Sequence, residues 1–408
     1  MLRVAYSPHQ KAFTARIDTL RKSFAKYKRS ISSRAFAKLP WASHPALAQV
    51  KGKGPFKHLV LVGMGGSSLG MKALCSALGI NDITFLDNVD PDFVQVQIES
   101  LNLKKTLFLL VSKSGGTIEV LSIAEILFAK IKSARNFLTI TDNSQGALAI
   151  FSKKKKIPCI TSPADVPGRF SILSIAGLLP AALAGVNAGA MLTGAQDTSW
   201  EDAFTLAAHQ FLHFKNGNNI TVFFPYSEGL TYVAEWYIQL LSESIGKSAK
   251  VGITPVKALG VKDQHSQLQL YLDGPRDKVV TFVALGGNHQ AKIPHAYEAF
   301  EEFAILGGKS IQELLDIERV ATAQALAKNG CPNQTLLLRE LSAHSLGQLL
   351  FLAQVETVFL GQLYDINPFD QPGVELIKKY IYGALHRPGY EIYQKELASL
   401  KKDKKFQI

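Results

Sequence analysis

Cysteine is scarce in this 408-residue sequence, and its three copies lie far apart without any C-x-x-C spacing. We therefore expect no disulfide framework and no cysteine-based metal site, as is typical of a reducing compartment such as the cytoplasm. Long apolar runs are missing as well. The run at 172–186 is broken by Ser, Gly and Pro and is too short to cross a bilayer. We expect no membrane association and no secretory signal.

Acidic residues are outnumbered, because 45 Lys and Arg face 33 Asp and Glu, for a formal net charge of +12. Such a surplus suits a nucleic-acid partner, an anionic small substrate, or solubility alone. The lysine-rich runs at 153–156 and 401–405 have no interleaved aromatic residues on which bases would stack. We interpret both runs as solvated surface and expect no nucleic-acid partner.

The first 38 residues contain a single acid, Asp18, among many Arg, Lys and Ser residues. Organellar transit peptides have this composition. However, Phe13, Ile17 and Phe24 fall at helical spacing, which an amphipathic arm packed on the body explains equally well. We favour the amphipathic arm.

Short apolar runs alternate with helical patterns along the rest of the chain. Runs of this kind are typical of parallel strands that helices cover on both faces, so the pattern predicts two consecutive α/β halves. A polar dip at 193–200 is the predicted linker between them. The predicted strands are 58–63, 83–86, 106–111, 137–141, 219–224, 279–285 and 335–338, and the predicted helices are 68–78, 230–245, 311–327 and 345–364.

Two glycine-rich turns each follow a predicted strand and open a helix: G-M-G-G-S-S-L-G at 63–70 and S-K-S-G-G-T at 112–117. Glycine lets the backbone approach an anion closely, and a helix N-terminus offers free N–H groups. The hydroxyls and lysine of the second turn favour phosphate. A plain tight turn or a Ser/Thr cap remains the alternative. A dinucleotide site fits the first turn less well, because Ser68 takes the third glycine position of G-x-G-x-x-G.

The run Q-L-L-S-E-S-I-G-K at 239–247 places Gln239 and Glu243 on one helical face near the end of a helix. An acid in so apolar a run predicts a desolvated carboxylate, which suits a general base. A surface glutamate paired with Lys247 is the alternative.

Histidines offer two further candidates. His265 lies in D-Q-H-S-Q-L, where neighbouring amides and an acid favour proton exchange with a ligand; a structural histidine is the alternative. His209 and His213 are four residues apart, but they lack the glutamate of H-E-x-x-H and a third ligand, so we expect no metal site.

Two further segments offer candidate site residues. The run N-P-F-D-Q-P-G-V-E-L-I-K at 367–378 offers Gln371 and Lys378 to a ligand, or only a turn with a solvated ion pair. Arg169, in P-G-R-F-S, is placed either against an anion or as the anchor of a turn.

Taken in order, these motifs resemble those of the phosphoglucose isomerase family over about residues 55–380. The resemblance implies an aldose–ketose isomerase that interconverts glucose 6-phosphate and fructose 6-phosphate through an enediol(ate), in glycolysis and gluconeogenesis. It also implies a homodimer with the active site between subunits, and no metal, nucleotide or other cofactor. The implied α/β architecture has two sugar-isomerase (SIS-type) α/β/α domains with parallel sheets, arranged as an N-terminal helical arm (1–50), a first domain (51–192), a second domain (200–366) and a C-terminal active-site turn and helix (367–408).

By matching position, the resemblance implies that Glu243 carries the proton between C2 and C1. His265 would open the sugar ring with the help of Lys378, and Arg169 would face the enediolate. The implied phosphate ligands are Ser112, Lys113, Ser114 and Thr117, and the implied lining of the sugar site is Gly66, Ser67, Gln239 and Gln371. An isomerase that also accepts mannose 6-phosphate, a non-catalytic sugar-phosphate sensor and a dehydrogenase are the rival interpretations.

Overall fold

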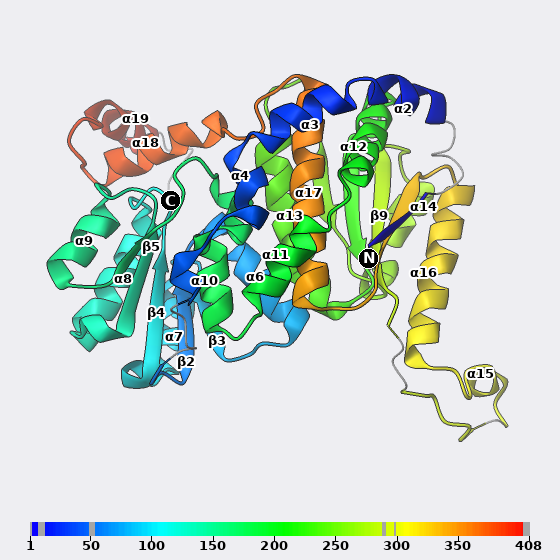
Figure 1. Ribbon diagram of the computed structural model, residues 1–408, viewed down its shortest axis with the longest axis horizontal. Coiled ribbons are helices and arrows are strands. Elements are labelled where there is room, and N and C mark those ends of the chain that lie inside the picture. Colours follow the sequence, from blue (N-terminus) through cyan, green and yellow to red (C-terminus); the bar gives the residue numbers. More distant parts are fainter. Residues whose placement is uncertain (1, 7–12, 49–53, 288–290, 298, 403–408) are drawn as a thin grey trace.

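The computed structural model describes residues 2–6, 13–48, 54–287, 291–297 and 299–402, and contains two five-stranded sheets (Figure 1). The first sheet is parallel throughout, in the order β3-β2-β4-β5-β6. The second has the order β1-β10-β9-β7-β8 and is parallel except for β1. The α/β class with parallel sheets is confirmed. The end of the second lysine-rich run, 403–405, lies outside the described residues.

All seven predicted strands are present, and three short edge strands were missed. Each missed strand carries exposed or half-buried positions, so no compact apolar run marks it. The strands are β1 Arg3–Tyr6, β2 His58–Val62, β3 Ile83–Leu86, β4 Thr106–Val111, β5 Phe137–Thr141, β6 Cys159–Thr161, β7 Ile220–Pro225, β8 Thr254–Lys257, β9 Lys278–Leu285 and β10 Asn333–Leu338.

Alternate residues of the central strands enter different cores. Leu59 and Leu61 of β2 face the core that the two sheets share, whereas Val60 and Val62 face a second core under α7 and α8. A third core lies on the far side of the second sheet, beneath α14 and α16. The helices involved are α6 Leu69–Leu78, α7 Pro91–Glu99, α8 Ile118–Ile131, α9 Ala147–Lys155, α10 Ile175–Leu183, α11 Ala188–Gln196, α12 Trp200–Lys215, α13 Thr231–Ile245, α14 Leu268–Asp273, α16 Ile311–Lys328 and α17 Ala343–Tyr364.

The linker predicted at 193–200 is shorter than expected, because α11 continues to Gln196 and packs closely on α17, which leaves 197–199 between α11 and α12. Gly194 and Gly347 permit this approach. A Cβ atom on Gly194 would lie 1.8 Å from the His344 carbonyl oxygen, and one on Gly347 would lie 2.0 Å from that of Met191. Polar residues made the segment look like a linker in the sequence, yet a glycine within it lets the two helices pack.

Helix α17 passes through the middle of the molecule (Figure 1). It is long and apolar enough to cross a membrane by length and composition, but 89% of its apolar window is buried inside the protein. A core helix of a globular protein has these properties.

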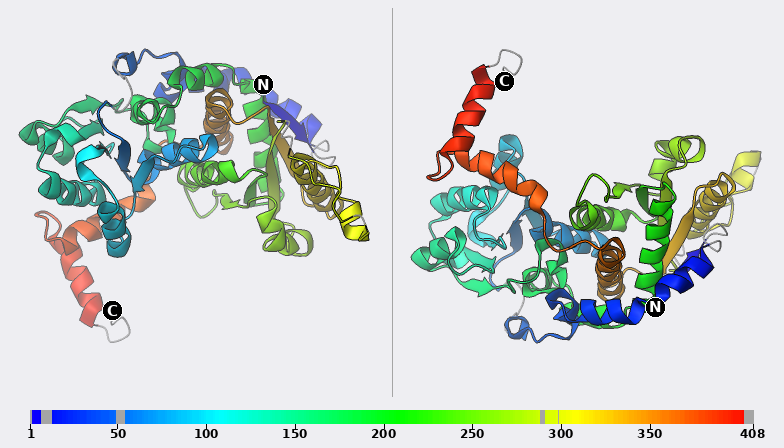
Figure 2. Two further views of the ribbon diagram at one scale, coloured as in Figure 1. Left: turned by 90° about the horizontal axis from the view of Figure 1, so that it is seen from below. Right: turned by 90° about the horizontal axis from the view of Figure 1, so that it is seen from above.

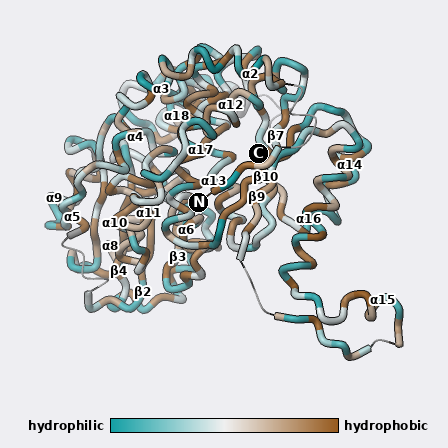
Figure 3. The backbone as a smooth tube through the Cα atoms, turned by 45° about the vertical axis from the view of Figure 1, so that its right-hand side comes forward, coloured by the Kyte–Doolittle hydropathy of each residue, from teal (hydrophilic) through white to brown (hydrophobic). Residues whose placement is uncertain are grey.

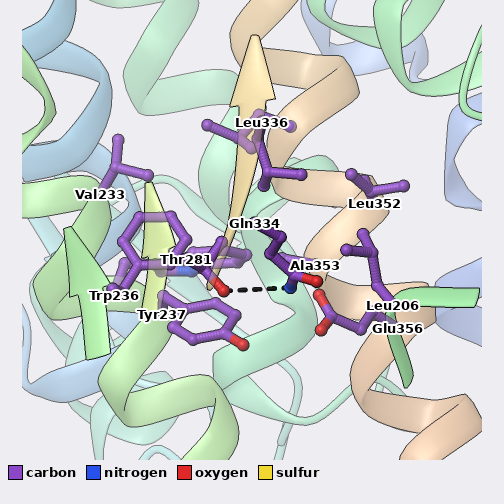
Figure 4. A pocket seen from close by; sticks show the side chains of 12 residues that line it. Leu206, Val233, Trp236, Tyr237, Thr281, Gln334, Leu336, Leu352, Ala353 and Glu356 are labelled. Carbon is purple, nitrogen blue, oxygen red and sulfur yellow. Dashed lines mark hydrogen bonds between the residues drawn. The ribbon is translucent and has the colours of Figure 1, made fainter. Parts of the chain in front are cut away.

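A small enclosed cavity lies between α13, α17 and the second sheet (Figure 4). Glu356 of α17 reaches it beside Tyr237, while Gln334 donates a hydrogen bond to the Thr281 hydroxyl at 3.1 Å. Burial raises the pKa of the Glu356 carboxyl to about 8. This glutamate is therefore neutral near pH 7, as expected for an acid whose charged form would lose its hydration.

The chain ends pack differently from one another. The predicted arm is helical from α2 (Thr14–Arg21) through α3 (Phe24–Ser32) to the short α4 (Ala35–Lys38) and α5 (Pro45–Ala48), with Phe13 and Ile17 buried as predicted. Strand β1 corrects the purely helical expectation, because it joins the second sheet. At the other end, α18 (Glu375–Ala384) and α19 (Glu391–Lys402) form a hairpin that projects from the body (Figure 2).

A second projection carries α15 (Glu301–Ala304), well away from both sheets (Figures 1 and 3). Its large side chains Tyr297, Phe300, Phe303 and Ile305 are all more than half exposed. Such a group of apolar side chains on an extended arm is typical of a surface that binds another protein.

Candidate active site

A pocket of about 630 Å³ opens where the loops after β2 and β4 meet α13 and α18. Strands β2 and β4 are parallel neighbours whose chains continue to opposite edges of the sheet, so a crevice forms between their carboxyl ends. Eleven of the twelve predicted site residues line it or contact its lining directly. The lining residues from the prediction are Gly66, Ser67, Lys113, Ser114, Thr117, Arg169, Gln239, Glu243, Gln371 and Lys378.

The first glycine-rich loop lies directly against the turn that carries Arg169. A Cβ atom on Gly66 would lie 2.4 Å from the Gly168 carbonyl carbon, so only glycine fits there. Gly65 has a φ of +53°, and a Cβ atom on it would lie 2.8 Å from the Gln239 amide nitrogen. The loop is thus held against both Arg169 and α13.

The second turn places polar groups around the N-terminus of α8. Ser114 accepts a hydrogen bond from the Gly116 amide at 3.2 Å, and Lys113 Nζ lies 3.7 Å from the Asp142 carboxylate. Burial raises the pKa of the Asp142 carboxyl, while the nearby Lys113 ammonium opposes the shift. Free N–H groups at a helix N-terminus, with a lysine and hydroxyls beside them, suit a phosphate.

Ser112 corrects the predicted set of phosphate ligands. It is 2% exposed and does not line the pocket. Its hydroxyl instead lies 2.8 Å from that of Thr117, so it orients the Thr117 hydroxyl. We call residues 112–117 the phosphate cradle; Ser112 belongs to it but lies behind the residues that line the pocket.

Glu243 lies at the end of α13, and each of its carboxylate oxygens accepts a hydrogen bond. Gln239 Nε2 donates to Oε1 at 3.0 Å, and Arg169 Nη1 donates to Oε2 at 3.2 Å. The side chain is 31% exposed, so the prediction of desolvated, apolar surroundings is wrong. The apolar neighbours Leu240 and Leu241 point into the core on the other side of the helix. The alternative pairing with Lys247 is also wrong, because that ammonium donates to the Glu243 main-chain carbonyl.

Arg169 joins three parts of the site. Its Nε donates to the buried Ser244 hydroxyl at 2.8 Å, and its Nη1 is shared between Glu243 and the Gln371 amide oxygen, 2.9 Å away. Its Nη2 donates to two main-chain carbonyls of the 367–371 turn. Burial lowers the pKa of Arg169, but the neighbouring carboxylate opposes the shift, so the guanidinium remains charged.

Lys378 of α18 reaches the pocket while paired with Glu375, whose Oε1 is 2.5 Å from its Nζ. The predicted ion pair and the predicted place at the site are therefore both present. Sequence reasoning missed four polar lining residues that lie outside the quoted motifs: Glu119, Lys379, Tyr382 and Tyr390.

His265 does not lie in this pocket. It ends a short 3-10 helix, η7 (Lys262–His265), and its side chain is exposed. The carboxylate of Asp263 accepts hydrogen bonds from the Leu259 amide at 2.7 Å and from the Ser266 hydroxyl at 2.6 Å. Hydrogen bonds to Asp263 thus hold the turn that carries His265, which does not line the pocket that contains Glu243.

The paired histidines of α12 have structural surroundings. The His209 ring packs on Tyr6 and the His213 ring packs on Phe13, with centroid distances of 4.6 and 4.8 Å. Burial lowers the pKa of His209 to about 4. Among the described residues, no group of three or more His, Cys, Asp or Glu side chains is arranged to hold a metal ion.

The family model described as phosphoglucose isomerase matches residues 48–388. The glucose-6-phosphate isomerase of Carboxydothermus hydrogenoformans is 35% identical and aligns over 98% of this chain and 94% of its own length. That of Thermus thermophilus is 38% identical over 78% of this chain and 81% of its own length.

Two solved structures are similar in fold. A hypothetical protein of Thermus thermophilus has a TM-score of 0.85 and 32% identity, covering 94% of this chain and 100% of its own. A glucose-6-phosphate isomerase of Chlamydia trachomatis has a TM-score of 0.78 at 22% identity, covering 98% and 92%. The sugar-isomerase architecture expected from the sequence is confirmed.

Proposed function

This chain belongs to the phosphoglucose isomerase family, and we propose that the pocket between β2, β4 and α13 is its active site, with Glu243 as the catalytic base. The protein is an isomerase that interconverts glucose 6-phosphate and fructose 6-phosphate, a step of glycolysis. One observation carries the assignment of the site: the Glu243 carboxylate and the Arg169 guanidinium are 3.2 Å apart in the pocket that the phosphate cradle lines.

The proposed chemistry is a proton transfer between neighbouring carbons. A C–H beside a carbonyl is weakly acidic, so the base must act while positive charge stabilises the enediolate. Glu243 takes the proton from C2 and returns it to C1, while a hydroxyl proton passes from O2 to O1 at the enediolate stage. The partly exposed carboxylate is open to the ligand. Arg169 Nη1, which is already directed between Glu243 and Gln371, faces the developing charge. General base catalysis contributes about 10²- to 10⁴-fold, so positioning and electrostatics supply the rest.

The phosphate end of the substrate belongs in the second glycine-rich turn. Lys113, Ser114 and Thr117 are its proposed ligands, and Ser112 orients the Thr117 hydroxyl. Binding a group remote from the reacting carbons fixes the sugar and so supplies part of this positioning. Gly66, Ser67, Gln239 and Gln371 are the proposed lining of the sugar site, and Lys378 assists at the ring oxygen.

His265 is the proposed ring-opening group, supplied by a second copy of the chain. Its exposed position away from the pocket of its own subunit supports a shared site in a homodimer. The exposed aromatic side chains of the arm around α15 support a partner surface as well. We also propose a role in gluconeogenesis, a cytoplasmic location, and the division into domains at 51–192 and 200–366 between the segments 1–50 and 367–408.

A coupled assay of fructose 6-phosphate conversion by the purified protein, with a chelator present, tests the reaction. Turnover that persists with the chelator supports metal-free chemistry, and complete loss contradicts it. Comparable turnover of mannose 6-phosphate would instead support the broader specificity considered above.

Subunit mixing tests the shared site. Glu243→Gln and His265→Ala are expected to be poorly active alone, because each destroys both sites of its dimer. Co-refolded at equal amounts, they should recover about a quarter of wild-type activity, since half of the dimers regain one intact site. No recovery, with heterodimers shown to form, would contradict the assignment of His265.

A further inference from the structure

Lys247 lies four residues beyond Glu243, just past the end of α13, and its ammonium is almost enclosed. Its Nζ donates to the Glu243 main-chain carbonyl at 2.9 Å and to the Asp370 carboxylate at 2.9 Å. It also donates to the Asp370 main-chain carbonyl. Its side chain is only 10% exposed, unlike that of a solvated surface lysine.

These contacts place one cation between two segments that are remote in sequence. A positive charge at the C-terminus of a helix binds the free carbonyls there and is favoured by the helix dipole. The same charge holds the turn at 367–371, which presents Gln371 to the pocket. Lys247 therefore links the helix that carries the base to the turn that faces it.

Asp370 is the centre of the turn. Its main-chain carbonyl accepts from both Lys247 and Arg169, the latter at 3.0 Å, and its carboxylate also accepts from Asn367 Nδ2 at 3.0 Å. The hydrogen bond from Lys247 lowers the pKa of the Asp370 carboxyl. Arg169 Nη2 further donates to the Pro368 carbonyl at 2.6 Å.

We propose that Lys247 and Asp370 are positioning residues for the isomerisation, which fix the turn that orients Arg169 against Glu243. The inference rests on the roles proposed above for Arg169 and Glu243. Neither Lys247 nor Asp370 lines the pocket, so they act through the groups that do.

The consequence is a specific kinetic signature. A loose turn moves the Pro368 and Asp370 carbonyls that hold the guanidinium, so the enediolate loses well-placed charge while the phosphate cradle is unchanged. Small displacements of a charged group cost about tenfold to a hundredfold in rate. We therefore expect kcat to fall about 10- to 50-fold in Lys247→Met and about 5- to 20-fold in Asp370→Asn, with KM changed less than threefold.

The experiment measures kcat, KM and inhibition by inorganic phosphate for Lys247→Met, Asp370→Asn and the double variant. If the two residues act through one contact, the double variant should be no slower than Lys247→Met. The inhibition constant for phosphate should stay within twofold of wild type, which general damage to the fold would not allow. Asp370→Asn keeps the main-chain carbonyl and a half-exposed side chain, so it remains informative if Lys247→Met does not fold.

Lys257→Met is the matched control. Lys257 of β8 pairs with Glu235 of α13 and so ties the same helix to the second sheet, but it does not line the pocket. Its kcat should stay within twofold of wild type. Wild-type kcat in both Lys247→Met and Asp370→Asn, or equal losses in the control, would overturn the inference. The roles beneath it are separately tested by Glu243→Gln: if that variant keeps its activity, the proposed site is wrong rather than only the positioning pair.

Discussion

Two glutamates lie in similarly apolar helical runs, and the structure treats them in opposite ways. Glu243 stands at the end of α13 and receives hydrogen bonds from Arg169 and Gln239, with 31% of its side chain exposed. Glu356 stands in the middle of α17, only 6% exposed, and burial raises its pKa to about 8. Glu243, which the sequence predicted to be desolvated, is paired with the Arg169 guanidinium. Glu356, which the sequence did not single out, is the buried one.

The difference comes from position along the helix and from what surrounds it. Every residue of α17 from Ser345 to Gly361 is buried, because helices and a sheet cover it on all sides. Helix α13 is covered over most of its length, but its last turn emerges beside the loops after β2 and β4. Apolar neighbours in the sequence thus indicate that one face of a helix packs in the core. They do not indicate the surroundings of a polar side chain on the other face.

The test of this comparison with the largest expected effect replaces each of the two glutamates by glutamine. Glu243→Gln should lower kcat by about 10³-fold, roughly 4 kcal/mol, because the amide cannot accept the proton. Glu356→Gln should leave kcat within threefold, since Glu356 already behaves as a neutral group and does not line the proposed active site. Steady-state kinetics in the coupled assay measures both.

Substrate binding provides the control for this exchange. The KM of Glu243→Gln, or its inhibition by inorganic phosphate, should remain near the wild-type value because the cradle is intact. Retained turnover in Glu243→Gln, or a comparable loss in Glu356→Gln, would remove the functional distinction between the two residues.

The second test is the pH dependence of stability. The Glu356 carboxyl has a pKa of about 8 in the folded protein against 4.5 for the ordinary side chain, so the folded state binds more protons between these values. Its contribution to stability is fully present below about pH 4.5 and is lost as pH rises through about 8. Between pH 5 and pH 8 we expect the free energy of unfolding to fall by roughly 2–4 kcal/mol from this group.

Glu356→Gln isolates the effect, because the amide keeps the shape and cannot titrate. Urea midpoints at pH 5, 6, 7 and 8 should diverge between wild type and variant, with the variant losing less stability as pH rises. His209, whose pKa is lowered to about 4, acts in both proteins and cancels in the difference. Parallel pH profiles would show that Glu356 is not neutral in the folded state.

Much of the fold was predictable because its physical causes are local. Compact apolar runs marked the seven strands, and a helix such as α13 was marked by its period. The edge strands β1 and β8 were not predictable, since half of an edge is solvated and the pattern fades. The linker was predicted too long because its residues are polar, whereas Gly194 within it serves packing against a helix about 150 residues away.

The site was predictable for a different reason: its motifs resemble a known family, and parallel strands bring their loops to one edge. The sequence did not reveal which side chains hydrogen-bond to one another within the site. Ser112 stands behind Thr117 instead of lining the pocket, and Lys247 caps a helix instead of neutralising Glu243. Such partners depend on side-chain directions fixed by distant packing, which no single motif records.

The Asp142 carboxylate is intermediate between buried Glu356 and charge-paired Glu243, and it provides the test with the smallest expected effect. Asp142 is 8% exposed, and its pKa is raised by burial, but Lys113 lies 3.7 Å away and opposes the shift. Lys113→Ala removes a proposed phosphate ligand and leaves that carboxylate unaccompanied, so KM should rise about tenfold, or roughly 1.4 kcal/mol, with kcat within threefold. The measurement is steady-state kinetics beside Lys130→Ala, a lysine of α8 that lies outside the pocket. If KM is unchanged, the turn at 112–117 is not where the phosphate binds, and Asp142 then belongs with Glu356 as a structural acid instead of beside the ligand.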